Sequence, residues 1–327
     1  MNSFQIKSSM ILDVLCFLQK RSLNDAKWMN KKQIKEIKYI NSLLPADFDD
    51  NCIGMSILCH VISTFIDDDL EHLTLDDLIR TFQSPHTIES VVKGKIKDGF
   101  TASYIYRVLD RLNDGFSEKY IKKLSTLKSI GFEKIYKKRI MPMVQKEIAQ
   151  KRDEVSKYNC EELYNNIAVL KNSPAIKQAN IYVSFFSAPT AFSLYRGSFL
   201  TCFGSAGPAD FFSIIAHELM HGFASNELTQ LYREHVERDQ KLSVCHKALI
   251  EDYKSGDEEE FVLAAEYYLC YLSGYYEKEK LLHKARKRYG GNCPTSVVIF
   301  ELLLQEKEIP RDYDRWLVRQ FRSGKIV

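Results

Sequence analysis

Residues 210–228 read DFFSIIAHELMHGFASNEL, and the interpretation of the rest of the chain depends on this stretch. Two imidazoles, His217 and His221, and the carboxylate of Glu218 lie in an apolar run with the pattern of a buried helix. Burying an unpaired polar group costs about 2–7 kcal/mol, so these three side chains need partners. We expect the helix to begin at Asp210, a plausible N-cap. Its other faces carry the apolar residues Phe212, Ile215, Leu219 and Phe223.

The spacing of the two histidines indicates a metal site. Residues four apart on a helix differ by about 40° in azimuth, so His217 and His221 project from one face, one turn apart. Two neutral imidazoles placed in this way can bind one Zn²⁺ ion. Glu218 follows the first histidine and can serve as the general base for a water molecule on the metal.

Zinc needs a third protein ligand, and two routes to it can be compared. The longer motif H-E-x-x-H-x-x-G-x-x-H has Ala224 at its glycine position here and Glu227 at its last histidine position, and no methionine follows Met220. We therefore disfavour Glu227. A carboxylate from a later helix, as in the His₂Glu catalytic sites, is the better expectation.

The segment EEEFVLAAEYYLCYL, residues 258–272, supplies such a helix. Glu260 stands at its apolar start, and the small residues Ala264 and Ala265 would let it pack closely against the motif helix. We predict Glu260 as the third ligand, with Glu259 and Glu266 as alternatives. Glu266 is turned well away from Glu260 on a helix.

The two segments together, HELMH at 217–221 and EFVLAA at 260–265, resemble the gluzincin metallopeptidases. The second is similar to the "E-F-F-A-E-A-F" helix of anthrax lethal factor and the Pro-Pro endopeptidases. Leu263 stands where that group has alanine, and Ala264 replaces its second glutamate. The resemblance implies a zincin fold, in which a small sheet lies over the active helix and its edge strand binds an extended peptide.

The same resemblance implies an oxyanion-stabilising tyrosine two helical turns before the ligand glutamate. The matching residue here is Tyr253. Tyr267, Tyr268 and His283 are alternatives for this role. The aminopeptidase motif "G-A-M-E-N" is absent from the sequence, which favours an endopeptidase.

The pattern along the chain predicts an α+β fold that is mainly α. Residues 1–172 indicate a helical N-terminal region, and residues 173–327 a zincin-like metallopeptidase domain with a small β-sheet. Strands are expected at 181–186 and within 193–204, with Gly197 as a break. Residues 198–204 are the candidate edge strand for binding substrate. A long helix from Phe132 should be interrupted at Pro142.

Composition limits the partners and the location. With 46 basic and 43 acidic side chains, the net charge is +3, which favours neither nucleic acid nor a membrane surface as a partner. No apolar run approaches the roughly 18 residues of a bilayer span, and the N-terminus lacks a signal-peptide pattern. Eight cysteines without a C-x-x-C pair are read as reduced thiols, so a cytoplasmic location is predicted.

The predicted activity is hydrolysis of a peptide or protein substrate by a zinc-activated water. Glu218 would take the proton of that water and pass it to the departing amine, while Tyr253 would stabilise the oxyanion. The alternative is a non-catalytic protein on a zincin scaffold that acts as an interaction module. The intact Glu218 argues against this alternative, because a structural zinc site does not require a base.

Overall fold

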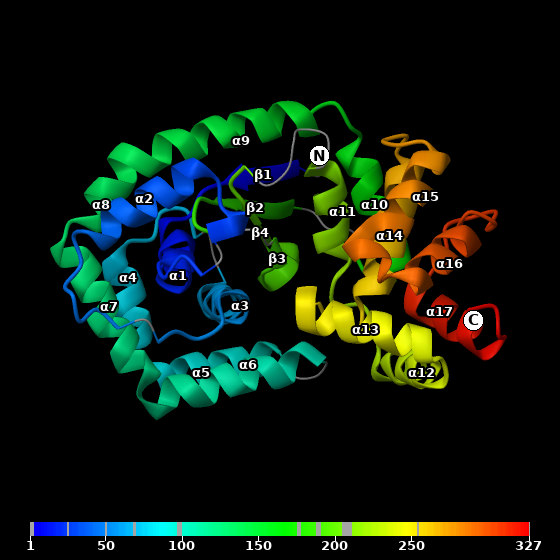
Figure 1. Ribbon diagram of the computed structural model, residues 1–327, viewed down its shortest axis with the longest axis horizontal. Helices are drawn as coiled ribbons and strands as arrows, with labels where there is room; N and C mark the ends of the chain where they lie inside the picture. The colour runs from blue at the N-terminus through cyan, green and yellow to red at the C-terminus, as the bar shows by residue number, and fades with distance from the viewer. Residues whose placement is uncertain are drawn as a thin grey trace. The chain divides into compact units, whose positions relative to one another are not determined.

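The computed structural model describes residues 3–24, 26–49, 51–67, 70–96, 100–174, 178–187, 191–204, 211–253 and 255–326. Most of these residues are helical, and four short strands form a sheet. The class is therefore α+β and mainly α, as the sequence predicts (Figure 1). Within the described part of the chain, none of the helices combines the length and the apolar character needed to cross a bilayer.

The chain divides into two compact units, and each is built from separate pieces of sequence. We call the first the motif unit; it comprises Met1–Ser3, Glu154–Gln178 and Ala209–Val327. The second, which we call the sheet unit, comprises Phe4–Asp153 and Ala179–Pro208. This division differs from the predicted boundary after residue 172, because the strand segment belongs with the N-terminal helices.

The sheet unit is mostly helical. Its helices are α1 (Met10–Lys20), α2 (Lys31–Asn41), α3 (Met55–Ile66), α4 (Leu75–Phe82), α5 (Pro85–Lys95), α6 (Phe100–Arg111), α7 (Ser117–Ser129), α8 (Phe132–Ile135) and α9 (Met141–Val155). Helix α7 ends just before Gly131, whose φ of 72° is the left-handed conformation common after a helix. A π-helical turn, Tyr136–Ile140, separates α8 from α9 beside Pro142. The predicted interruption at this proline is confirmed.

The sheet has the strand order β1-β2-β4-β3. The strands are β1 (Ser3–Lys7), β2 (Gln178–Ser184), β3 (Phe192–Ser193) and β4 (Phe199–Cys202). β2 and β4 run parallel, with Ile181 opposite Phe199, whereas β3 and β4 are antiparallel. The two predicted strand segments are thus confirmed. Residues 3–7 form a strand where the sequence pattern indicated helix.

The prediction that residues 198–204 form an edge strand is wrong. β4 lies between β2 and β3, so the edges of the sheet are β1 and β3. All four residues of β4 are buried, which fits a strand with neighbours on both sides. Sequence patterns report which residues are apolar, but they do not report which strands pair, and β4 is internal because it pairs with both β2 and β3.

A buried carboxylate lies between α1 and the sheet. Asp13 is fully buried. The hydroxyl of Tyr136, a residue of the π-helical turn, donates a hydrogen bond of 2.6 Å to its carboxylate. The Ser184 hydroxyl and the backbone N–H of Phe186 also donate to Asp13. Burial raises the pKa of Asp13 to about 6, although these hydrogen bonds act to lower it. The group should therefore make the stability of the protein depend on pH.

Apart from connecting turns and the first residues of β1 and β2, Ser3 and Gln178, the described residues of the motif unit are helical. Its helices are α10 (Cys160–Leu170), α11 (Phe211–Met220), α12 (Asn226–Arg238), α13 (Gln240–Tyr253), α14 (Glu259–Leu272), α15 (Lys278–Lys287), α16 (Pro294–Leu303) and α17 (Tyr313–Arg322). Helix α14 is buried from Glu259 to Cys270 and packs between α11 and α16 (Figure 1). This packing brings the motif helix α11 and the second predicted helix together.

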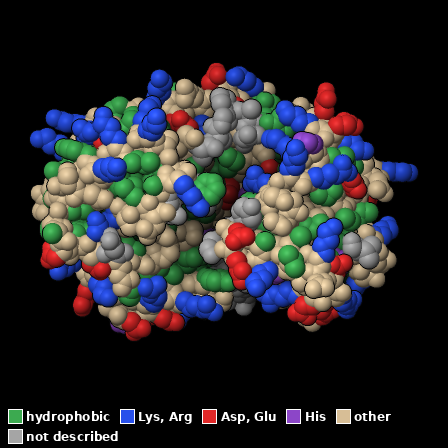
Figure 2. All heavy atoms as spheres, in the orientation of Figure 1, with side chains coloured by type: hydrophobic (Ala, Val, Ile, Leu, Met, Phe, Trp, Pro, Cys, Tyr) green, Lys and Arg blue, Asp and Glu red, His purple; other side chains and the backbone are tan. Residues whose placement is uncertain are grey.

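The surface and the cysteines agree with the composition. Figure 2 shows Lys and Arg side chains interspersed with Asp and Glu over the face drawn, as expected for a net charge of +3. All eight cysteines are free thiols, and five of them are buried. The structure therefore pairs none of the eight in a disulfide.

Candidate metal centre

The motif helix α11 ends just before the second histidine. His221 follows its last residue, Met220, and Gly222 then takes a left-handed conformation with φ 78°. The Lys171 ammonium donates to the carbonyl of Leu219 at 3.1 Å and to that of His221 at 2.7 Å. These bonds satisfy carbonyls that the helix end leaves free. The predicted N-cap at position 210 lies outside the described residues.

Each histidine is held by a carboxylate on its Nδ1 atom. His217 Nδ1 lies 3.0 Å from Glu266 Oε2, and His221 Nδ1 lies 2.9 Å from Glu258 Oε1. A carboxylate accepts, so each Nδ1 carries its hydrogen and donates. In the neutral imidazoles, the Nε2 atoms are then acceptors, and they face each other at 3.2 Å. Two lone pairs this close repel unless a proton or a metal cation lies between them.

Glu259 completes the cluster as the third possible ligand. Its Oε1 atom lies 3.7 Å from His217 Nε2, and the ligand atoms of His217, His221 and Glu259 all lie within 4.8 Å of one another. Zn–N bonds of about 2.0–2.1 Å at a tetrahedral angle place two nitrogens about 3.3 Å apart. The observed Nε2–Nε2 separation of 3.2 Å is close to this value. The three side chains could therefore hold a metal ion.

Glu260, the predicted third ligand, is not part of this cluster. Its carboxylate accepts a hydrogen bond of 2.7 Å from the Tyr232 hydroxyl and one of 2.9 Å from the backbone N–H of Ser296. Neighbouring residues on a helix point about 100° apart, so Glu259 and Glu260 cannot share one direction. Glu259 and Glu266 are seven residues apart and share a face. This heptad spacing was visible in the sequence and would have favoured Glu259.

Four successive acids, residues 257–260, surround the start of α14, and each contacts different partners. Asp257 accepts from Arg233 at 3.0 Å and contacts His246 Nε2 at 3.0 Å. Glu258 contacts His221 and also accepts from the backbone N–H of Gly222 at 3.1 Å. Negative charge is favourable near the N-terminus of a helix. The acidic run therefore fixes the orientation of α14 as well as contributing to the cluster.

The charges of the cluster shift the pKa values of its members. Burial acts to lower the pKa of His221, but the hydrogen bond and charge of Glu258 outweigh it and raise the pKa to about 9. The pKa of His217 is also raised, because Glu259 and Glu266 outweigh the opposing effect of burial. Carboxylates thus attract positive charge to this position, whether protons or a metal cation.

Glu218 is buried beside these imidazoles. The residue is 7% exposed, and its Oε2 atom has no hydrogen-bond partner among the described residues. Burial raises the pKa of its carboxyl, although the two histidines act to lower it. A buried carboxylate oxygen without a partner is available to accept a proton from a bound molecule.

The predicted oxyanion stabiliser is Tyr253, the last residue of α13, whose side chain lies outside the described part of the structure. Among the alternatives, Tyr267 lies buried against Phe300, and His283 is exposed on α15. The structure places another tyrosine at the cluster: the Tyr289 hydroxyl donates to Glu259 Oε1 at 2.8 Å. Sequence reasoning missed Tyr289, because it lies in a turn without a recognised motif.

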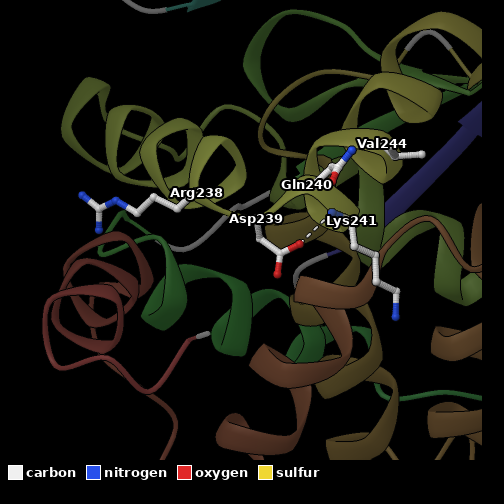
Figure 3. Close-up of a pocket in the computed structure, with 5 residues that line it drawn as sticks. All are labelled: Arg238, Asp239, Gln240, Lys241 and Val244. Atoms are coloured by element: carbon white, nitrogen blue, oxygen red, sulfur yellow. Dashed lines mark hydrogen bonds between the residues drawn. The ribbon is translucent and has the colours of Figure 1, made fainter.

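Glu227, disfavoured as a ligand, lies at the surface and forms an ion pair with Arg322. Another surface feature is a shallow depression where α12 meets α13 (Figure 3). The residues that line it are Arg238, Asp239, Gln240, Lys241 and Val244, and none belongs to the histidine cluster. Its carboxylate, Asp239, already accepts hydrogen bonds from the backbone N–H groups of Lys241 and Leu242 at the start of α13. The carboxylate that lines the depression is therefore already hydrogen-bonded to the backbone.

The chain matches no protein-family model, no curated protein and no solved structure. Its function has to be argued from the chemistry of the site.

Proposed function

We propose that this protein is a zinc-dependent metallopeptidase, in which His217, His221 and Glu259 hold the metal and Glu218 is the general base. The observation that carries the proposal is the pair of Nε2 atoms that converge at 3.2 Å while both Nδ1 atoms face carboxylates. A buried cation between these nitrogens relieves their repulsion, and imidazole together with carboxylate is a donor set that suits zinc.

Zinc, when bound, supplies Lewis acidity that polarises a peptide carbonyl and lowers the pKa of water toward about 7. The protein's own residues do the rest. Glu266 and Glu258 hold the imidazoles in the Nδ1–H tautomer, so that both Nε2 atoms point inward. Glu218 takes the proton of the attacking water on its unpartnered oxygen and delivers it to the departing amine.

Two further features of the proposal come from the resemblance to gluzincins. A zincin-like arrangement and an endopeptidase activity are proposed on the motif residues 217–221 and the glutamate-bearing helix α14. The oxyanion stabiliser is proposed to be a tyrosine, with Tyr253 as the position that the resemblance implies. A cytoplasmic location stays a prediction from the sequence.

The test is substitution of the base. Glu218→Gln should bind zinc with unchanged stoichiometry and lose turnover by roughly 100-fold or more, as expected for a positioned proton-transfer group. Glu227→Gln, which makes the same change at the surface, is the matched control and should cleave like the wild type. The assay is cleavage of a peptide library by the zinc-loaded full-length protein.

Two results would contradict the proposal. Equal cleavage rates for Glu218→Gln and the wild type would show that Glu218 is not the base. Stoichiometric zinc with no cleavage of any peptide would instead favour a non-catalytic interaction module on the same scaffold.

A further inference from the structure

An unusual turn lies beside the candidate metal centre. Residues Arg288–Gly291 form a short 3₁₀ turn after α15, and Tyr289, Gly290 and Gly291 have φ values of 49°, 68° and 87°. A left-handed conformation is common for glycine but unfavourable for tyrosine. The Asn292 side chain donates to the carbonyl of Tyr289 at 2.8 Å, and the Tyr289 hydroxyl donates to Glu259. The turn is therefore fixed to the candidate centre through Tyr289.

Arg288 is carried by the same turn. Its guanidinium carbon lies 4.8 Å from the centre of the Tyr289 ring, and the residue is exposed. It forms no ion pair with a carboxylate in the described part of the chain, whereas its neighbour Arg286 pairs with Glu301 at 3.1 Å. The guanidinium hydrogen-bonds the Tyr289 side chain, which leaves others of its five donors for a ligand next to the centre.

The acids near Arg288 are already engaged. Glu266 accepts from Ser213 and contacts His217, and Glu259 accepts from Tyr289. Partial desolvation acts to lower the pKa of Arg288, but the nearby carboxylate of Glu266 and, more weakly, that of Glu259 raise it. The guanidinium therefore stays charged close to the cluster without being neutralised by a direct contact.

We propose that Arg288 is a specificity-determining residue that binds a carboxylate of the peptide substrate beside the scissile bond. The inference rests on the proposed peptidase function. A planar guanidinium with five donors matches a carboxylate in a bidentate geometry. The carboxylates of the centre would repel an acidic peptide, and Arg288 offsets that repulsion on its side of the cluster. The carboxylate can come from an Asp or Glu side chain or from a free C-terminus.

Cleavage by the zinc-loaded full-length protein tests the proposal. The probes are peptides selected from the library, each made with Glu or Gln near the cleaved bond and with a free or amidated C-terminus. The wild type should prefer one acidic form by about 10- to 100-fold in kcat/KM, the range of a charged hydrogen-bonded contact. The arm with the larger ratio, side chain or C-terminus, identifies the source of the carboxylate.

Variants of the turn assign that preference. Arg288→Ala should reduce the ratio to about one, and Arg288→Lys should retain part of it, since lysine keeps the charge but loses the bidentate fork. Arg286→Ala, which removes an arginine two residues away, should keep the wild-type ratio. The proposal is overturned if Arg288→Ala keeps the wild-type ratio, or if Arg286→Ala lowers it equally.

A binding measurement separates this proposal from the peptidase proposal. Calorimetry with zinc-loaded Glu218→Gln and the same paired peptides should show tighter binding of the acidic member, lost in the double variant with Arg288→Ala. If no peptide is cleaved but this Arg288-dependent difference persists, the peptidase function fails and the carboxylate site stands. Cleavage without any acidic preference overturns the carboxylate site alone. If the protein neither binds nor cleaves the peptides, both proposals are overturned.

Discussion

Replacing Glu259 and Glu260 separately by glutamine should separate metal binding from stability. Glu259 Oε1 faces the imidazoles, so Glu259→Gln removes a charged ligand atom. Loss of an outer partner of a metal site costs about 10- to 100-fold in affinity, so loss of a direct ligand should exceed about 100-fold, or about 3 kcal/mol. Its effect on folding should be small, because the amide oxygen can still accept from Tyr289.

Glu260→Gln should have the opposite effect. Glu260 is 3% exposed and accepts from Tyr232 at 2.7 Å and from the Ser296 N–H at 2.9 Å. Glutamine keeps one acceptor oxygen and turns an NH₂ group toward the other donor. The free energy of unfolding should fall by about 1–3 kcal/mol, while zinc affinity stays within a few-fold of the wild type.

The assay has two parts: competition with a chromophoric chelator gives zinc affinity, and urea unfolding of metal-free protein gives the free energy of unfolding. The reasoning is refuted if Glu260→Gln loses zinc by more than about 100-fold while Glu259→Gln binds it normally. That result would mean that α14 presents Glu260, rather than Glu259, to the histidines.

Three further predictions concern groups around the cluster and in the sheet unit. Glu266→Gln should lower zinc affinity about 10- to 100-fold, because Glu266 orients His217; unchanged affinity in the chelator competition would rule out this role. Asp13 has its pKa raised from 3.8 to about 6, so the folded protein holds this proton more tightly than the unfolded chain. The wild-type free energy of unfolding should therefore fall, relative to Asp13→Asn, by about 2 kcal/mol as pH rises from about 4 to about 6; urea unfolding at both pH values tests this, and parallel pH profiles would contradict it. Lys171→Met removes two hydrogen bonds to carbonyls at the end of α11, so the free energy of unfolding in urea should fall by about 1–3 kcal/mol. An unchanged free energy of unfolding would show that these bonds contribute nothing to stability.

The sequence predicted the features that are local. The apolar run with His217, Glu218 and His221 predicted the motif helix, and the β-branched and aromatic segments predicted β2 and β4. Pro142 predicted the interruption of the helix that begins at Phe132. Each of these depends on the spacing of residues within about one turn or one strand. Such spacing is set by helix and strand geometry and can be read without the fold.

The features that depend on tertiary packing were not predicted. The choice between Glu259 and Glu260 is set by how α14 rotates against α11, and only the packing of both its faces fixes that rotation. The position of β4 inside the sheet depends on its pairing with both β2 and β3, which the spacing of residues along the chain does not reveal. Tyr289 contacts Glu259 from a turn in which its own φ is positive, and no periodic sequence pattern predicts such a turn.

The central claim is that one zinc ion lies between His217, His221 and Glu259, and anomalous diffraction tests it most directly. Data from crystals of the zinc-loaded protein, collected above and below the zinc absorption edge, should show a peak within about 2.0–2.2 Å of both Nε2 atoms and a Glu259 oxygen. A map with no peak among these atoms, or with zinc bound elsewhere in the protein, would contradict the account.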